Sequence, residues 1–463
     1  MKKIKRIAVI ITALLISIQC IFSFGCSNAG KVKPKVDTVN FLCYWFPPEI
    51  KPDLAYVNQN LEEVDAALKQ IKAGGMDVVV FNEWQTGRIG SDISNKYMDL
   101  CKENGLKVSL HLRNNYIDEG GMQGDGELYE TDFANSEYLD NVLYIAMGDE
   151  PPYDGIEKFA DYIPKFEANF SVPYFINLFP TYMSADLLSG HSYEEYVEHY
   201  CNTILKKLKG ERWLSVDHYP YLGGVQSDQS GMTPTYLQNL EVMRYAVKDI
   251  ENSHLNLDIM TCSMTDRRLP EIGDIRQQVY VGMLYGVEQF TVYTYGFPRG
   301  NPYHIEGTMA MVDEYTGEPT QIYYDVQKVI SEIKAFEDVY LSYEYNGTKT
   351  YSAGLSYDVT HRNPAFYEKY LKHQVKSFDK VESIFATQDT VVSEFFNNDG
   401  DKAYIMLNYA DPIEKKVDNV TVRFKNAKKV DVIIKGITKT VDVVDGCIDI
   451  SLEPGEGCMF IPK

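Results

Sequence analysis

Apolar, strand-like runs and helix-like patterns alternate eight times between about residues 38 and 336, and this alternation constrains the fold more than any other feature. It is typical of βα units on a parallel sheet. Eight units in about 300 residues fit a (β/α)8 barrel, which takes roughly 250 residues plus insertions. An open doubly wound sheet shares the alternation, but no expected strand is followed by the Gly-rich turn of a nucleotide-binding sheet. We therefore predict an α/β fold with a TIM barrel over residues 38–337.

The expected barrel strands cover residues 39–46, 76–81, 107–112, 141–147, 174–178, 213–216, 257–262 and 289–295. After about residue 338 short alternating strands take over, at 404–408, 420–424 and 430–434. Turn signals at 398–400 (NDG) and 453–455 (EPG) punctuate this part of the chain. Residues 338–463 are therefore expected to form a linker and a small C-terminal antiparallel β-sandwich.

Residues 1–26 have the pattern of an export signal. Basic residues at positions 2–6 precede an apolar run at 7–22 that is too short to span a membrane comfortably. The run ends in Phe22-Ser23-Phe24-Gly25-Cys26, which resembles the bacterial lipoprotein cleavage box. The resemblance implies an extracytoplasmic protein that begins with a lipid-modified Cys26 and is anchored to the cell membrane, with residues 27–37 as a polar tether. Ser23 stands where an aliphatic residue is usual, so plain secretion is the alternative.

Charge and aromatic content narrow the range of partners. The formal net charge is −21, which argues against a nucleic-acid partner because phosphate binding needs a basic surface. The chain has 35 tyrosines, and a tyrosine ring combines a flat apolar face with a polar tip that suits stacking on sugar rings. Most of these tyrosines are also explained by β-rich cores and domain seams.

In one stretch, residues 141–152, an expected strand leads directly into two acidic residues. An apolar run ends abruptly in Gly148-Asp149-Glu150-Pro151. A buried strand that ends in carboxylates is how a parallel barrel presents catalytic groups at its C-terminal rim. Pro151 favours extended geometry at Glu150, and neighbouring side chains on an extended chain point to opposite sides. We therefore expect Glu150 to aim into the central opening and Asp149 to turn toward its supports; a solvated acidic turn is the alternative.

Polar and aromatic residues follow most of the other expected strands. A rim with acids, amides, an arginine and many aromatics suits a polyhydroxylated, mostly neutral ligand, so an oligosaccharide or polysaccharide is the predicted partner. No metal or cofactor is predicted, because the cysteines lack zinc spacing and the histidines lack a third ligand. The residues expected to bind substrate are Trp45, Glu83, Trp84, His111, Arg113, Asn114, Asp149, Asn177, His218, Tyr219, Tyr293 and Tyr295.

Several segments together resemble a known group of enzymes. Residues 148–151 (GDEP), 217–220 (DHYP), 275–280 (IRQQVY) and 290–295 (FTVYTY) look like glycoside hydrolase barrels of clan A type, and secreted bacterial relatives of the family 42 β-galactosidases are nearest in character. Residues 451–457 (SLEPGEG) are similar to the last turn of the β-sandwiches that follow such barrels. The resemblance implies an O-glycosidase with Glu150 as general acid/base, since the clan places that residue after strand four.

The second catalytic carboxylate is less well defined. The clan usually has Asn before the acid/base and a Glu at the end of strand seven, whereas this chain has Asp149 and then the segment 262–266 (CSMTD). The candidates are, in order, Asp217, Asp266 and Glu271. Asp217 could instead bind a sugar hydroxyl or orient an arginine, and Asp266 could pair with a neighbouring arginine.

Two other functions fit the same residues. The missing Glu after strand seven is compatible with a carbohydrate-binding surface lipoprotein that keeps the barrel without catalysis. A polysaccharide lyase or another carbohydrate-active barrel is the third possibility.

Overall fold

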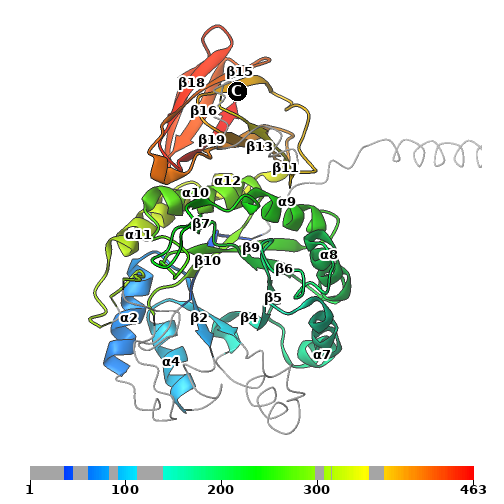
Figure 1. Cartoon of the computed structure of the whole chain (residues 1–463), viewed down its shortest axis with the longest axis vertical. Coiled ribbons are helices and arrows are strands. Elements are labelled where there is room, and N and C mark those ends of the chain that lie inside the picture. Colours follow the sequence, from blue (N-terminus) through cyan, green and yellow to red (C-terminus); the bar gives the residue numbers. More distant parts are fainter. Residues whose placement is uncertain are drawn as a thin grey trace, which may run out of the picture.

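The structure, a computed structural model, describes residues 36–44, 61–82, 92–111, 139–297, 307–313, 315–353 and 370–463. Eight parallel strands close into a barrel, helices surround it, and a pair of antiparallel sheets follows (Figure 1). This confirms the predicted fold class, a TIM barrel followed by a β-sandwich.

Each barrel strand lies beside its neighbours in the sequence, so the barrel is built unit by unit along the chain. A short hairpin, β7 (Tyr221–Leu222) with β8 (Gly231–Met232), is inserted between the sixth and seventh barrel strands. All eight predicted strand positions are confirmed to within a few residues. In order around the barrel the strands are β1 (Asn40–Tyr44), β2 (Val78–Asn82), β3 (Lys107–His111), β4 (Val142–Asp149), β5 (Tyr174–Leu178), β6 (Arg212–Asp217), β9 (Ser253–Met260) and β10 (Gln289–Tyr293).

The helices form a ring outside the strands (Figure 1). Their apolar residues recur every three or four positions, as in α2, where Val64, Leu68 and Ile71 are buried. Among the described residues, no helix combines the length and apolar character needed to cross a bilayer. The helices are α2 (Leu61–Ala73), α4 (Asp92–Glu103), α7 (Ile156–Asn169), α8 (Tyr193–Thr203), α9 (Tyr236–Val247), α10 (Ile272–Leu284), α11 (Gln321–Lys334) and α12 (Glu337–Leu341).

Strand β9 shows how the barrel separates its two faces. Leu255, Leu257 and Ile259 belong to the apolar core between strands and helices. The residues between them, Asn256 and Asp258, point to the opposite face, toward the barrel interior, because side chains alternate along a strand. The barrel interior is therefore polar along this strand.

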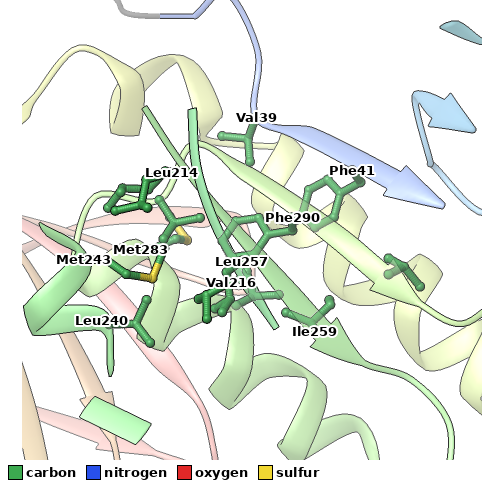
Figure 2. Packing of buried hydrophobic residues seen from close by; sticks show 14 of the residues in the cluster. Val39, Phe41, Leu214, Val216, Leu240, Met243, Leu257, Ile259, Met283 and Phe290 are labelled. Atoms are coloured by element: carbon green, nitrogen blue, oxygen red, sulfur yellow. The ribbon is translucent and has the colours of Figure 1, made fainter. Parts of the chain in front are cut away.

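The apolar layer between the strands and helices is continuous around this part of the barrel (Figure 2). Phe41 of β1 and Phe290 of β10 stack with ring centroids 5.5 Å apart. Leu240 and Met243 of α9 and Met283 of α10 pack into the same layer. This packing supports the strands, and the functional side chains project from the strand ends.

The C-terminal domain has two antiparallel sheets with an apolar core between them. The predicted strands at 404–408, 420–424 and 430–434 are confirmed as β14, β15 and β16. The six-stranded sheet has the order β11 (Glu344–Tyr351), β13 (Thr390–Phe396), β14 (Lys402–Asn408), β19 (Gly457–Pro462), β16 (Lys429–Ile434) and β17 (Ile437–Asp442), and the three-stranded sheet has the order β12 (Val381–Ala386), β15 (Asp418–Phe424) and β18 (Cys447–Leu452).

The sandwich docks on the barrel through α10 and the loop before it. Gln277 of α10 donates from Nε2 to the backbone oxygen of Ala410 over 2.9 Å. Arg268 donates to Asp411 over 2.9 Å, which joins the loop after β9 to the loop after β14. The two backbones also meet closely, since a Cβ added at Gly455 would lie 2.0 Å from the oxygen of Gly273. The contact therefore braces the barrel.

Candidate active site

The end of β4 differs from the expected extended geometry. Glu150 has φ = 48°, in the left-handed region, although Pro151 follows it. The register between β4 and β5 shifts between Ala146 and Gly148, and the Glu150 N–H then donates to the oxygen of Asn177 over 2.8 Å. This tertiary bond outweighs the local preference for extended backbone. As a result the chain turns at Glu150, which corrects the expectation of extended geometry at this residue.

Four carboxyl groups gather at this C-terminal mouth. Asp149 and Glu150 come from β4, Asp217 ends β6, and Asp258 lies opposite Asp217 in the β6–β9 register. The first three are half-buried, and Asp258 is 8% exposed. The charges of the two β4 acids raise the pKa of both Asp217 and Asp258, so the four groups form one electrostatic cluster.

Burial and mutual repulsion hold protons on this cluster. Burial, and then the charge of Asp149, raise the pKa of Glu150 to about 7, and the interaction with Asp217 partly offsets the rise. Burial raises the pKa of Asp258 to about 8, against hydrogen bonds from Thr291 and Asn256. Burial followed by the charge of Glu150 raises the pKa of Asp217 well above its usual range. Near neutral pH the mouth therefore offers both protonated and ionised carboxyl groups.

The pair Glu150 and Asp217 is the centre of the cluster. The charge of Glu150 raises the pKa of Asp217, so the two neighbouring carboxyl groups do not ionise together and the pair keeps one proton at intermediate pH. The Oδ1 atom of Asp217 is buried, and within the described part of the chain it has no hydrogen-bond partner. The pair thus presents a proton donor next to a carboxylate.

Tyrosine rings line one side of the mouth. The Tyr293 ring lies 5.5 Å from Tyr44 and 5.5 Å from Tyr219, and it stacks on the latter at 29°. The charges of Asp217 and Asp258 act on the Tyr293 hydroxyl, which places this ring beside the carboxyl cluster. Two of the predicted substrate-binding residues, Tyr219 and Tyr293, therefore come together with the acids.

Asn177 also reaches the cluster, because its Nδ2 donates to Asp149 Oδ1 over 3.2 Å. His218 does not line the opening. Its ring is fully buried, and its nitrogens bond to Asn239 over 2.9 Å and Thr233 over 2.7 Å. Burial lowers the pKa of His218 to about 3, so the ring is neutral and anchors the loop after β6.

Three further residues lie apart from the carboxyl cluster. Asp266 is an exposed side chain, 60% accessible, that pairs with Arg267. Glu271 begins α10 and pairs with Lys415 of the sandwich domain. Tyr295 is 4% exposed and donates to Gln70 of α2, so it faces the helix layer. Asp266, Glu271 and Tyr295 were expected at the barrel mouth. The structure instead places them in these other contacts, away from the carboxyl cluster.

The remaining predicted residues lie outside the described part of the chain and stay predictions. For His111 the strand is described but the side chain is not. The others are Cys26, Trp45, Glu83, Trp84, Arg113 and Asn114.

The structure adds two residues that the sequence reasoning missed. Asp258 had a readable signal, because it follows Asn256 by two positions in a stretch where Leu and Ile occupy the alternate places, and so it shares the inward face of Asn256. Tyr182 had none. It stands in the loop after β5, 39% exposed, with its hydroxyl accepting from the N–H of Tyr219 over 3.5 Å and the Arg267 guanidinium 5.3 Å from its ring.

The described residues contain no group of three or more His, Cys, Asp or Glu side chains arranged to hold a metal ion. The carboxyl groups of the described mouth can transfer protons and attack as carboxylates, and aromatic surfaces lie beside them.

Comparison with known proteins gives structural likenesses only. No family model and no curated protein matches the chain. A GH27 β-L-arabinopyranosidase from Geobacillus stearothermophilus aligns over 93% of this chain and 97% of its own, with 8% identity and a TM-score of 0.49. A GH5_18 protein from Bifidobacterium longum, solved with Manb1-4GlcNAc, aligns over 64% and 78%, with 11% identity and a TM-score of 0.43. A β-galactosidase from Marinomonas ef1 aligns over 66% and 62%, with 10% identity and a TM-score of 0.45. Likenesses of this size assign neither activity nor substrate to this chain.

Proposed function

We propose that this chain is an extracytoplasmic glycoside hydrolase that cleaves O-glycosidic bonds at the carboxyl cluster of the barrel mouth. The observation that carries the proposal is the placement of Glu150 and Asp217 together at the C-terminal ends of β4 and β6, where the charge of Glu150 acts on Asp217. Glycosidic hydrolysis needs one protonated and one ionised carboxyl group beside the bond. Stacked tyrosines next to the pair suit the apolar face of a sugar ring.

The proposed mechanism gives Glu150 the proton-donor role, because its pKa of about 7 leaves it partly protonated near neutral pH. Glu150 protonates the glycosidic oxygen, the bond from that oxygen to the anomeric carbon breaks, and a carboxylate partner either attacks that carbon or activates a water. Asp217 is the first choice for the partner. Retaining enzymes hold the two carboxyls about 5–5.5 Å apart and inverting enzymes about 6.5–9.5 Å, so their separation in the substrate complex decides which role Asp217 takes.

Asp258 is the second choice for the partner, in place of Asp266. Asp258 lies in the cluster, whereas Asp266 is exposed and paired with an arginine. A panel of aryl glycosides and oligosaccharides, tested with Glu150→Gln, Asp217→Asn, Asp258→Asn and Asp266→Asn, separates these assignments. We expect Glu150→Gln and one of the two cluster variants to lose turnover while Asp266→Asn keeps it. Wild-type turnover by Glu150→Gln would contradict the proposal.

Anchoring at Cys26 is part of the same proposal and rests on the sequence of residues 1–26. Expression of the full chain in a bacterial host with a clickable fatty acid tests it. We expect the protein to be labelled and membrane-bound, and Cys26→Ala to abolish the label. Unlabelled protein in the medium would favour plain secretion instead.

A non-catalytic carbohydrate-binding protein is the second candidate, favoured by the end of β9. The residues that follow β9, Cys262 and Ser263, are buried, and Ser263 exchanges hydrogen bonds with the backbone of Met309. The acid of this strand, Asp258, stands two residues before the end of β9. Calorimetric binding of oligosaccharides without release of reducing sugar would support this candidate, and measured turnover would exclude it.

A further inference from the structure

A chain of side-chain hydrogen bonds crosses five strands inside the barrel, from β4 to β10. Four of its members lie on one register row, since Asp149 pairs with Asn177, Asn177 with Ser215, and Ser215 with Asn256 in the strand ladders. Residues at one level of a barrel meet inside it, which allows the bonds to run from strand to strand. We call this chain the polar belt; its members are Asp149, Asn177, Ser215, Asn256, Asp258 and Thr291.

Ser215 lies at the middle of the polar belt and joins its two halves. The Ser215 hydroxyl donates to Asn177 Oδ1 over 2.8 Å and accepts from Asn256 Nδ2 over 2.8 Å. Asn177, with its carbonyl so occupied, turns its Nδ2 toward Asp149 and donates over 3.2 Å. The orientation of the Asn177 amide is thus set by the Ser215 hydroxyl.

The other half of the polar belt runs through Asn256 and ends at Asp258, which also accepts a hydrogen bond from an amide. Asn256 Nδ2 donates to Asp258 Oδ1 over 2.9 Å as well as to Ser215. The Asn256 carbonyl accepts from the Thr291 hydroxyl over 3.1 Å. A flipped amide would put an oxygen against the oxygens of both Ser215 and Asp258, so the orientation of Asn256 is determined by its neighbours.

We infer that Ser215 is a positioning residue, whose hydroxyl fixes the amides of Asn177 and Asn256 and through them places Asp149 and Asp258 at the mouth. Ser215 and Asn256 are fully buried, so Ser215 acts beneath the mouth and does not touch a ligand. The catalytic part of the inference rests on the proposed function. The geometric part, the hold on Asp258, does not.

The barrel contains a matched control in Ser109 of β3. Ser109 is also fully buried, and its Oγ has no hydrogen-bond partner in the described part of the chain. Ser109→Ala and Ser215→Ala therefore delete the same atom from a buried strand serine. Only Ser215→Ala breaks bonds of the polar belt.

The first readout is kcat and KM, measured on an aryl glycoside that the wild-type protein hydrolyses. We expect Ser215→Ala to lower kcat about 10-fold, since small misplacements of catalytic groups are costly, while KM stays within about twofold. Ser215→Cys keeps a weak hydrogen-bond donor of similar size, so its kcat should lie between those of Ser215→Ala and wild type. It replaces Ser215→Ala in the test if that variant does not fold. Ser109→Ala should match wild type. Equal kcat for folded Ser215→Ala and Ser109→Ala would overturn the catalytic part.

A titration without substrate gives the second readout. The pKa of Asp258 is measured by ¹³C NMR on protein with labelled aspartate carboxyls, and the signal is assigned by its loss in Asp258→Asn. The Asn256 bond favours the ionised form of Asp258, so Ser215→Ala should raise this pKa further above about 8, and Ser109→Ala should leave it in place. An unmoved midpoint in Ser215→Ala and Ser215→Cys would overturn the inference. A moved midpoint in a protein that hydrolyses no glycoside would uphold the positioning and reject the proposed function.

Discussion

Two regions of the molecule bury acidic side chains, and they treat them in opposite ways. At the seam between barrel and sandwich, Arg276 forms a bidentate pair with Glu332 over 2.6 and 2.9 Å. At the barrel mouth, Glu150, Asp217 and Asp258 face one another, and none of them has an ion-pair partner within the described residues. A buried acid with an arginine is an element of structure, whereas buried acids without one hold protons. The comparison separates the helix-covered side of the barrel, on which the sandwich packs, from the barrel mouth (Figure 1).

The largest expected effect is on turnover at the mouth. Glu150→Gln or Asp217→Asn should lower kcat on an aryl glycoside by about 10²–10⁴-fold, the range for loss of a positioned acid or base. Because the two carboxyls are proposed to act in the same step, the double variant should fall little further than the worse single variant. Additive losses in the double variant would show that the two carboxyls work independently.

At the seam the expected loss is in stability. Arg276→Met leaves the buried Glu332 carboxylate without its partner and should lower the free energy of unfolding by about 3–5 kcal/mol. Urea unfolding measures the change, and Arg276→Met/Glu332→Leu should recover most of it. Lys415→Ala, which breaks the exposed pair with Glu271, is the control and should cost at most about 1 kcal/mol. Loss of kcat in the folded Arg276→Met protein would contradict the claim that the seam contributes to stability alone.

The acids of the mouth predict how stability depends on pH. Glu and Asp titrate near about 4.3 and 3.9 when unfolded, while Glu150 and Asp258 titrate at about 7 and about 8 in the fold. Between these values the folded state binds more protons than the unfolded state, so these groups make stability fall as pH rises from about 4 to 8. Urea midpoints at pH 5 and pH 9 should therefore differ less for Glu150→Gln and Asp258→Asn than for wild type. If the difference between the two midpoints is the same in the variants as in wild type, groups other than Glu150 and Asp258 cause the pH dependence.

The smallest expected effect concerns the tyrosine rings. Tyr219→Leu removes the ring that stacks on Tyr293 and should raise KM about 3–10-fold, in line with ~0.5–1.5 kcal/mol per aromatic contact. The value of kcat should change less, because the ring supplies binding and no proton. Tyr324→Leu, on the exposed surface of α11, is the control. A larger loss in kcat than in KM would give Tyr219 a role in the reaction itself.

The fold was predictable because buried parallel strands read as apolar runs and the sandwich strands alternate. The residue Glu150 was found for the same reason, at the abrupt end of such a run. Its backbone conformation was not, because φ = 48° depends on a register shift against β5 that no local pattern records.

Simple strand geometry explains the side chains whose predicted positions were wrong. His218 is the neighbour of Asp217 and therefore points to the other side of the chain. Tyr295 was expected to continue the alternation of Tyr293, but β10 ends at Tyr293 and the alternation ends with it. Asp258 lies within its strand, so a prediction from strand ends does not include it, although its period-2 spacing from Asn256 predicts an inward side chain.

The most direct test of Glu150 as proton donor compares leaving groups. Hydrolysis of a dinitrophenyl glycoside needs little protonation of the departing oxygen, whereas an alkyl glycoside of the same sugar needs it fully. We predict that Glu150→Gln loses at least about 10²-fold more kcat/KM on the alkyl glycoside than on the dinitrophenyl glycoside. Equal losses on both substrates, or no loss on either, would contradict the proton-donor role that the carboxyl pair at the mouth supports.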